Sequence, residues 1–280
     1  MTRIFSSIEI LRPLNMILCL LAVFISAWLV DGIISPLLPY AALVVFCFAG
    51  ASNILNDVLD IHIDEINRPN RVLPSGRLRI QDALILMGFL YVVGLMACTY
   101  LQPLGRQIAL ITVLPLLVLY TPLFKRVPFI GNLVVGGILG LVFLFTEGAI
   151  HGNTNTMWIP FFLATALSTI RELCKDAADM AGDSTANIQT FPRKFGLIST
   201  LWLLRLLTIA LCFFAITPYA SGYYGIIYLV TLILGVEIPL LFSVFMVLSE
   251  KSGSADYSKA AKTLKGVTIA GMVVILSSAF

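Results

Sequence analysis

Apolar side chains gather along the chain in nine long runs that are separated by short polar segments. An α-helix crosses a hydrocarbon core about 30 Å thick with ~20 apolar residues, and in lipid only such a helix or a closed barrel satisfies its own backbone polar groups. Each run is therefore predicted to form a transmembrane helix. The runs lie at 14–34, 37–55, 83–102, 105–121, 129–149, 157–173, 198–217, 223–249 and 264–280.

The composition agrees with this pattern and excludes a soluble globular protein. Of the 280 residues, 59% are hydrophobic and only 12% are charged, and the mean hydropathy is +0.98. Nine spans with short connections use almost the whole length. The chain is therefore expected to be an all-α integral membrane protein with a single domain over residues 1–280, in which nine helices form one bundle. Neither a nucleic-acid partner nor an obligate protein partner is expected.

The positions of Lys and Arg predict the orientation of these helices. Sixteen of the 18 basic residues fall on the side that holds the N-terminus, whereas Arg106 lies on the opposite side and Arg205 lies within the seventh run. Cytoplasmic loops collect Lys and Arg. The N-terminus is therefore expected in the cytoplasm. Because the predicted number of helices is odd, the C-terminus is expected outside the cell membrane.

Carboxylates concentrate in two of the cytoplasmic segments with the same spacing. Asn56 to Asp64 reads N-D-V-L-D-I-H-I-D, and Lys175 to Asp183 reads K-D-A-A-D-M-A-G-D. The aspartates stand at i, i+3 and i+7 in both segments, at a constant offset of 119 residues. At ~100° per helical residue, each trio shares one helix face. The repetition predicts an internal duplication with equivalent halves and Asp-rich cytoplasmic loops.

The two acidic faces predict a site for Mg²⁺ and a diphosphate. Six carboxylates at a membrane edge repel one another unless cations lie between them. Oxygen ligands suit Mg²⁺, which carboxylates commonly share with substrate phosphates. Asn53 and Glu172 extend the two faces by one turn. Basic residues would supply donors to the remaining phosphate oxygens, and those placed to do so are Arg71, Arg77, Lys125 and Lys175.

Two other interpretations of the acidic segments are open. In the first, the carboxylates are solvated loop charges paired with nearby basic residues, and their local density argues against this. In the second, the chain is a divalent-cation transporter, whose acids would lie near the bilayer midplane. Five of the nine runs offer only Glu147 and Glu237, so an enzyme is favoured.

These residues resemble the UbiA superfamily of intramembrane prenyltransferases. The first family signature, N-D-x-x-D-x-x-x-D with a following Pro-Ser-Gly-Arg turn, matches Asn56 to Asp64 and Pro74 to Arg77. The second, D-x-x-x-D preceded by K-D, matches Lys175 to Asp183. The R-P-x-N of Arg12 to Asn15 and the Y-T-P-x-x-K-R of Tyr120 to Arg126 are also similar to family elements.

The resemblance implies a reaction and a set of site residues. Two Mg²⁺ ions would neutralise the diphosphate that leaves an isoprenoid donor, and a lipophilic acceptor would capture the carbocation. The implied catalytic residues are Asp60, Asp64, Asp179 and Asp183. The implied metal ligands are Asn56, Asp57, Asp60, Asp64, Asp176, Asp179 and Asp183. The implied substrate-binding residues are Asn15, Asn53, Arg68, Arg71, Arg77, Tyr120, Lys125, Arg171 and Lys175.

Two stretches look most similar to the archaeal-type members, which add a second geranylgeranyl chain to geranylgeranylglyceryl phosphate in ether-lipid synthesis. They run from Ile66 to Arg77 and from Arg171 to Asp183. Members with hydroxybenzoate, quinone or chlorophyll-type acceptors share much of the first motif, so an aromatic acceptor is the alternative. An acceptor with its own phosphate needs more cations near the acidic faces, and their surplus here favours the glyceryl phosphate.

Small residues mark the fifth run. Asn132, Gly136 and Gly140 stand at i, i+4 and i+8, on one face of the predicted helix. Such a stripe predicts close packing against a neighbouring helix. The alternative is that these residues line a cavity for the isoprenoid tail.

Overall fold

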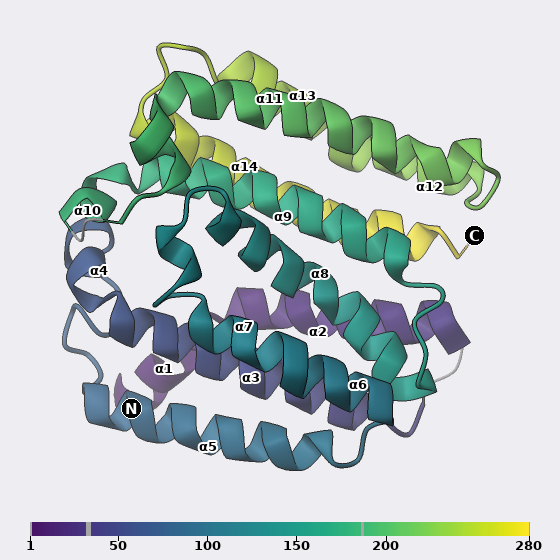
Figure 1. Ribbon diagram of the computed structural model, residues 1–280, viewed down its shortest axis with the longest axis horizontal. Helices are drawn as coiled ribbons and strands as arrows, with labels where there is room; N and C mark the ends of the chain where they lie inside the picture. The colour runs from purple at the N-terminus through teal and green to yellow at the C-terminus, as the bar shows by residue number, and fades with distance from the viewer. Residues whose placement is uncertain (1, 32–34, 186–187, 280) are drawn as a thin grey trace. The chain divides into compact units, whose positions relative to one another are not determined.

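The computed structural model describes residues 2–31, 35–185 and 188–279, and in these ranges the regular structure is entirely helical (Figure 1). Every one of the nine predicted runs coincides with a helical segment. Residues 32–34 of the first run and Phe280 of the ninth lie outside the described residues. The all-α class follows from the chemistry of the runs, because a long apolar segment in lipid satisfies its backbone polar groups as a helix.

The chain divides into two compact units. Unit 1 comprises Met1–Phe124, Leu141–Met157 and Ala181–Asn187, and unit 2 comprises Lys125–Gly140, Trp158–Met180 and Ile188–Phe280. The helices α8 (Ile130–His151) and α10 (Met180–Thr185) each contribute residues to both units. The expectation of one domain in a single bundle stays a prediction.

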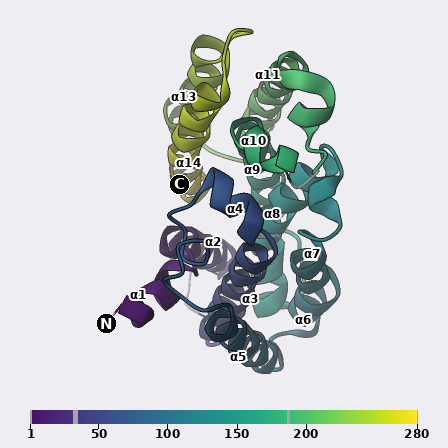
Figure 2. The same cartoon turned by 90° about the vertical axis from the view of Figure 1, so that its left-hand side faces the viewer.

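In unit 1, the long helix α3 packs against α2 and α5, and α7 also contacts it. Figure 2 shows α3 between α2 and α5. A Cβ atom on Gly94 of α5 would lie 2.6 Å from the Phe48 ring of α3, so glycine permits this close approach. The elements are α1 (Thr2–Glu9), α2 (Pro13–Asp31), α3 (Leu38–Leu59), α4 (Ile61–Asn67), α5 (Ile80–Cys98), α6 (Pro103–Gln107), the π-helical η1 (Ile108–Val113) and α7 (Leu114–Leu119).

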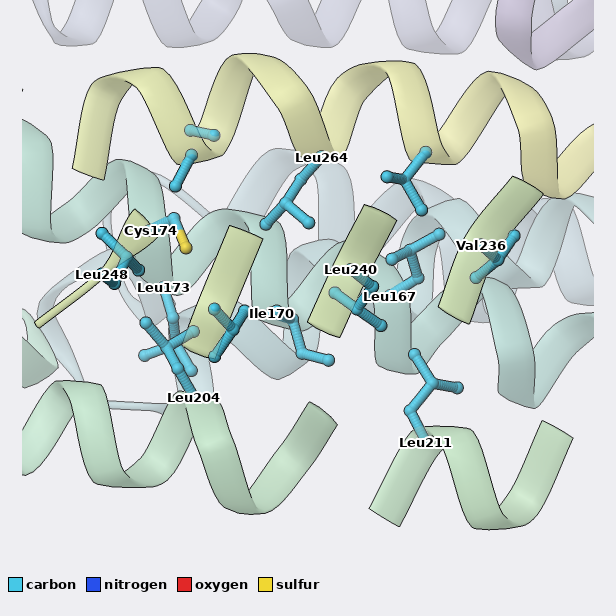
Figure 3. Close-up of a cluster of buried hydrophobic side chains, with 14 of the residues drawn as sticks. Leu167, Ile170, Leu173, Cys174, Leu204, Leu211, Val236, Leu240, Leu248 and Leu264 are labelled. Atoms are coloured by element: carbon cyan, nitrogen blue, oxygen red, sulfur yellow. The ribbon is translucent and has the colours of Figure 1, made fainter. Parts of the chain in front are cut away.

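In unit 2, α9 contacts both α11 and α14. Its core contains Leu173, Leu204, Leu240 and Leu264, which come from four different helices and are fully buried (Figure 3). Because lipid is as apolar as these side chains, their contribution comes from van der Waals contact more than from exclusion of water. The elements are η2 (Phe124–Arg126), α9 (Trp158–Ala178), α11 (Phe191–Ala220), α12 (Ile226–Leu232), η3 (Ile233–Glu237), α13 (Ile238–Leu241), η4 (Phe242–Val247) and α14 (Ser254–Ser277).

Seven helices of the described chain are long and apolar enough to cross a membrane. They are Pro13–Val30, Leu38–Leu59, Ile80–Cys98, Ile130–His151, Phe191–Ala220, Ile226–Val247 and Ser254–Ser277. Of the other two predicted spans, Pro103–Leu119 is shorter, and α9 ends in charged turns that contain Arg171, Glu172 and Lys175. The chain is thus a multi-pass membrane protein, and its ninefold crossing stays a prediction.

The helix boundaries recur along the chain at nearly the offset of the aspartates. The helices α2, α3 and α4 begin at residues 13, 38 and 61, and α8, α9 and α10 begin at 130, 158 and 180, which gives offsets of 117, 120 and 119. Arg12 (φ 58°) precedes α2 and Phe129 (φ 67°) precedes α8, and both have the left-handed backbone conformation that is uncommon outside glycine. This recurrence agrees with the predicted internal duplication.

Two boundaries differ from the sequence-based ones. The last helix, α14, begins at Ser254, ten residues before the predicted ninth run, so Lys259 and Lys262 lie on it. The helix α11 begins at Phe191 and is kinked at Gly196 (φ 83°, ψ 166°). Both extensions contain basic residues, Arg193 and Lys194 in α11 and Lys259 and Lys262 in α14, which lower the hydropathy of these segments.

The first half of α8 packs closely on α9 within unit 2. A Cβ atom on Gly136 would lie 2.3 Å from Thr169 Oγ1 and 2.6 Å from the carbonyl oxygen of Thr165. A Cβ atom on Gly140 would lie 2.2 Å from Thr165 Oγ1. The predicted close helix contact is therefore confirmed for both glycines.

We expect Gly136→Ala to destabilise the protein by about 1–3 kcal/mol, because the added methyl group meets the backbone of α9. Gly137→Ala is the matched control, since a Cβ atom on Gly137 would have no neighbour within 4 Å. That change should be neutral or stabilise by up to ~1 kcal/mol through helix propensity. The measurement is the free energy of unfolding in detergent micelles. Equal effects of the two substitutions would contradict the close contact.

Candidate active site

The first acidic motif lies in unit 1, where α3 meets α4. Asp57 is in the last turn of α3 and Asp64 is in α4, and both are buried, with 4% and 3% of their surface exposed. Arg71 Nη1 lies 3.1 Å from Asp57 Oδ1 and 2.5 Å from Asp64 Oδ2. Arg12 Nη2 also pairs with Asp57 Oδ1. Two buried carboxylates therefore share one guanidinium.

The helix that the acidic spacing predicts through each trio is interrupted at the middle aspartate. Asp60 (φ −96°, ψ 8°) ends α3 and precedes α4, and the equivalent Asp179 separates α9 from α10. The helix through each trio is therefore not continuous. Asp57 and Asp64 nevertheless contact one guanidinium, that of Arg71, and the common face of each trio stays a prediction. The acidic residues lie on helices or at their junctions rather than in loops.

Burial and neighbouring charges act in opposite directions on the Asp64 carboxyl. Burial raises its pKa above the ordinary value, the nearby Arg71 guanidinium opposes this rise, and the Asp57 carboxylate adds to it. An acid whose pKa is raised by folding keeps its proton to a higher pH in the folded state. Its contribution to stability therefore falls as the pH rises through that range. A cation beside Asp64 therefore stabilises the folded protein most when this carboxyl is ionised.

Two amides of the first motif are bonded within unit 1. Asn53 Nδ2 donates to the carbonyl oxygen of Leu11 over 3.0 Å, and Asn56 Oδ1 accepts a hydrogen bond from Thr121 Oγ1. Asn15 is half-buried in the first turn of α2. Substrate binding by Asn53 and Asn15 and metal binding by Asn56 stay predictions.

Arg77 connects the Pro-Ser-Gly-Arg turn to α1 through hydrogen bonds and an ion pair. Its Nη2 lies 2.8 Å from Glu9 Oε1 and 2.7 Å from the carbonyl oxygen of Asn70, and its Nε donates to Ser75 Oγ. The bond from Arg77 lowers the pKa of Glu9. Gly76 supplies the left-handed conformation (φ 70°) that the turn requires. The predicted role of Arg77 in substrate binding stays a prediction beside this structural one.

The second acidic motif is supported from α8 in unit 2. Asp176 Oδ2 accepts a 2.7 Å hydrogen bond from Nδ2 of Asn132, which is 3% exposed. One turn earlier on α9, the buried Glu172 accepts from Arg171 Nη1 over 3.1 Å and from Lys175 Nζ over 2.5 Å. Asp183, which belongs to unit 1, is buried on α10.

The remaining predicted residues lie at helix ends. Arg68 follows α4, Tyr120 follows α7, and Lys125 is in η2. All three side chains are half-buried. Their roles stay predictions.

Three residues that were not among the predicted site residues contact the acidic motifs. Arg12 pairs with Asp57, Thr121 bonds Asn56, and Asn132 bonds Asp176. Arg12 and Thr121 lie in the R-P-x-N and Y-T-P stretches, in which Asn15 and Tyr120 are the residues predicted to bind substrate. Asn132 is an amide within an apolar run. A polar side chain in a membrane helix usually has a functional role, and this was the signal in the sequence.

The donor chemistry of the first motif fits Mg²⁺. Among the described residues, no three His, Cys, Asp or Glu side chains gather into a group that could hold a metal ion. Asp57 and Asp64 nevertheless converge on one cationic group, the guanidinium of Arg71. Their carboxylate oxygens are the ligands that Mg²⁺ prefers, and a substrate phosphate commonly supplies further oxygens to this ion.

Comparison with known proteins connects this geometry to one family. Residues 16–264 match the model of the UbiA prenyltransferase family. The digeranylgeranylglyceryl phosphate synthase of Natronomonas pharaonis is 32% identical over 234 residues, covering 83% of this chain and 84% of the relative. A solved structure of a digeranylgeranylglyceryl phosphate synthase has a TM-score of 0.78 at 27% identity, covering 100% of this chain and 99% of the other. A UbiA homologue from Archaeoglobus fulgidus bound to GPP and Mg²⁺ has a TM-score of 0.69 at 14% identity, with coverage of 96% and 99%.

We expect Arg71→Leu to destabilise the metal-free protein, because it leaves Asp57 and Asp64 without their shared cation. Loss of one partner from a fully buried pair costs ~3–5 kcal/mol, and the partial exposure of Arg71 reduces the expected loss to about 2 kcal/mol. Arg79→Leu is the control, since its ion pair with Asp82 is largely exposed. Unfolding is measured in detergent with EDTA. A loss for Arg71→Leu no larger than that for Arg79→Leu would exclude this role.

Proposed function

Because the chain belongs to the UbiA prenyltransferase family, we propose that it transfers a geranylgeranyl group from geranylgeranyl diphosphate to geranylgeranylglyceryl phosphate. Prenyl transfer is the activity of the family. The proposed substrates are supported by one observation: the chain is similar over most of its length to archaeal enzymes that are named for this product. Family membership removes the support for a cation transporter.

The acidic motifs hold the metal in this proposal. Mg²⁺ neutralises the leaving diphosphate when it is bound. The proposed ligands are Asn56, Asp57, Asp60, Asp64, Asp176, Asp179 and Asp183, with two ions bridging the diphosphate. The carboxylate pair beside Arg71 supports the first motif in this role. The Mg²⁺ and GPP bound to the Archaeoglobus fulgidus homologue support the choice of ion.

Arg71 and Arg12 exchange partners when substrate binds. Both guanidinium groups neutralise Asp57 in the structure. With a metal ion held by these carboxylates, each arginine would be available to donate to phosphate oxygens, for which the planar guanidinium is well suited. The same exchange is open to Arg171 and Lys175, which pair with Glu172. In this proposal the same cations pair with carboxylates before substrate binds and with phosphate oxygens afterwards.

The acceptor supplies the nucleophile. A glycerol hydroxyl is weak until the allylic carbocation forms, and it loses its proton late, so the site needs no strong base. The apolar helices exclude water, which would otherwise convert the donor to an alcohol. Asp60 and Asp179, at the two helix breaks, and Asp64 and Asp183, on the short helices that follow, are the proposed catalytic residues.

The proposal is tested by offering the purified protein geranylgeranyl diphosphate and Mg²⁺ with a panel of acceptors. We expect geranylgeranylglyceryl phosphate to be prenylated in preference to any aromatic acid, with products identified by mass spectrometry. Asp60→Ala and Asp179→Ala should lower turnover at least 100-fold, because each removes a proposed metal ligand. Efficient prenylation of an aromatic acid, without an ether-lipid product, would overturn the acceptor and leave the family unchanged.

The acidic motifs and the N-terminus face the cytoplasm in this proposal, and the C-terminus lies outside. The support is the gathering of basic residues on one side of the predicted spans. A cysteine is introduced at an exposed position near each end of the chain, and intact cells are treated with a membrane-impermeant thiol reagent. We expect the cysteine near the C-terminus to react and the cysteine near the N-terminus to be protected. Protection of the C-terminus would mean an even number of crossings.

A further inference from the structure

Asn132 is buried in the first turn of α8, where an amide is costly unless it is hydrogen-bonded. Its Nδ2 lies 2.7 Å from Asp176 Oδ2. A carboxylate oxygen accepts and cannot donate when it is ionised, so the amide must present its N–H to Asp176. The distance is typical of a bond to a charged acceptor. This contact joins the start of α8 to the second acidic motif.

The packing of α8 on α9 holds this contact in place. Asn132, Gly136 and Gly140 follow one face of α8, and a Cβ atom on either glycine would collide with Thr169 or Thr165 of α9. The backbones therefore approach without intervening side chains. Phe129, immediately before α8, keeps a left-handed conformation and packs its ring against Phe191 at 6.3 Å between centroids. These contacts hold the start of α8, and with it Asn132, in place.

The first half of the chain holds the equivalent carboxylate in the same way. Asp57 corresponds to Asp176 at the 119-residue offset, and it is bonded by Arg12, which directly precedes α2. The helix α2 is the counterpart of α8, and a left-handed residue precedes each. Each half therefore brings a donor from the start of one helix to the first aspartate of its acidic motif. The donor is charged in unit 1 and neutral in unit 2.

We infer that Asn132 is a positioning residue, which orients the Asp176 carboxylate for Mg²⁺ without placing a positive charge beside it. This inference rests on the proposed function. A neutral donor to one carboxylate oxygen restricts the orientation of the Asp176 side chain. Partners of this kind set the affinity of a metal site, and their loss typically weakens binding by ~10–100-fold.

The test measures Mn²⁺ binding to the full-length protein in detergent by electron paramagnetic resonance, with inorganic diphosphate present. Asn132→Leu keeps the side-chain size and removes the donor, and we expect it to weaken Mn²⁺ binding about 10-fold. Asn132→Ala is the second variant and should behave alike. Leu133→Ala, at an exposed neighbouring position, is the control that should leave Mn²⁺ affinity unchanged. Thermal unfolding in EDTA verifies that each variant is folded.

A double-mutant cycle separates positioning from general damage. In an Asp176→Asn background, Asn132→Leu should have no further effect on Mn²⁺ affinity, because the carboxylate that it orients is gone. Unchanged affinity in both folded Asn132 variants, or an equal loss in the Asp176→Asn background, would overturn the inference. Failure of the wild-type protein to bind Mn²⁺ or to transfer a prenyl group would instead overturn the proposed function.

Discussion

Two carboxylates buried at the end of an apolar helix require a positive partner, and in unit 1 this partner is Arg71. Burial removes the hydration of Asp57 and Asp64, and the two carboxylates would repel each other without this cation. Arg71 follows α4 and Asp57 lies on α3, so the same ion pair connects the segment after α4 to α3.

Carboxylates and cations lie close together in both acidic motifs, and they neutralise one another. Arg12 and Arg71 do this at Asp57, and Lys175 does so at Glu172. In the proposed function, a metal ion and a diphosphate would replace these ion pairs by others, without placing an unpaired charge in an apolar surrounding.

The two halves of the chain hold the first aspartate of each acidic motif by a similar arrangement of helices but with different donor groups. In both, a left-handed residue precedes a helix, a residue at or just before the start of that helix bonds the first aspartate, and the next helix ends next to the second aspartate. Arg12 supplies a charged donor in one half, and Asn132 supplies a neutral one in the other. Asp57 and Asp176, which are equivalent by the common offset, therefore have different hydrogen-bond donors at the starts of corresponding helices.

The amino-acid sequence predicts the helical class, the positions of the apolar helices and the two acidic motifs with their common offset. These follow from local chemistry, because lipid demands about 20 apolar residues per span and acidic spacing is visible in the chain. It did not reveal the breaks at Asp60 and Asp179, the bond from Arg77 to Glu9, or the partners of Asp57 and Asp176. Arg12 and Asn132 lie 45 and 44 residues from the aspartates that they contact. Contacts between residues so far apart in the chain depend on how closely the helices pack, and a single methyl group on Gly136 would change that distance.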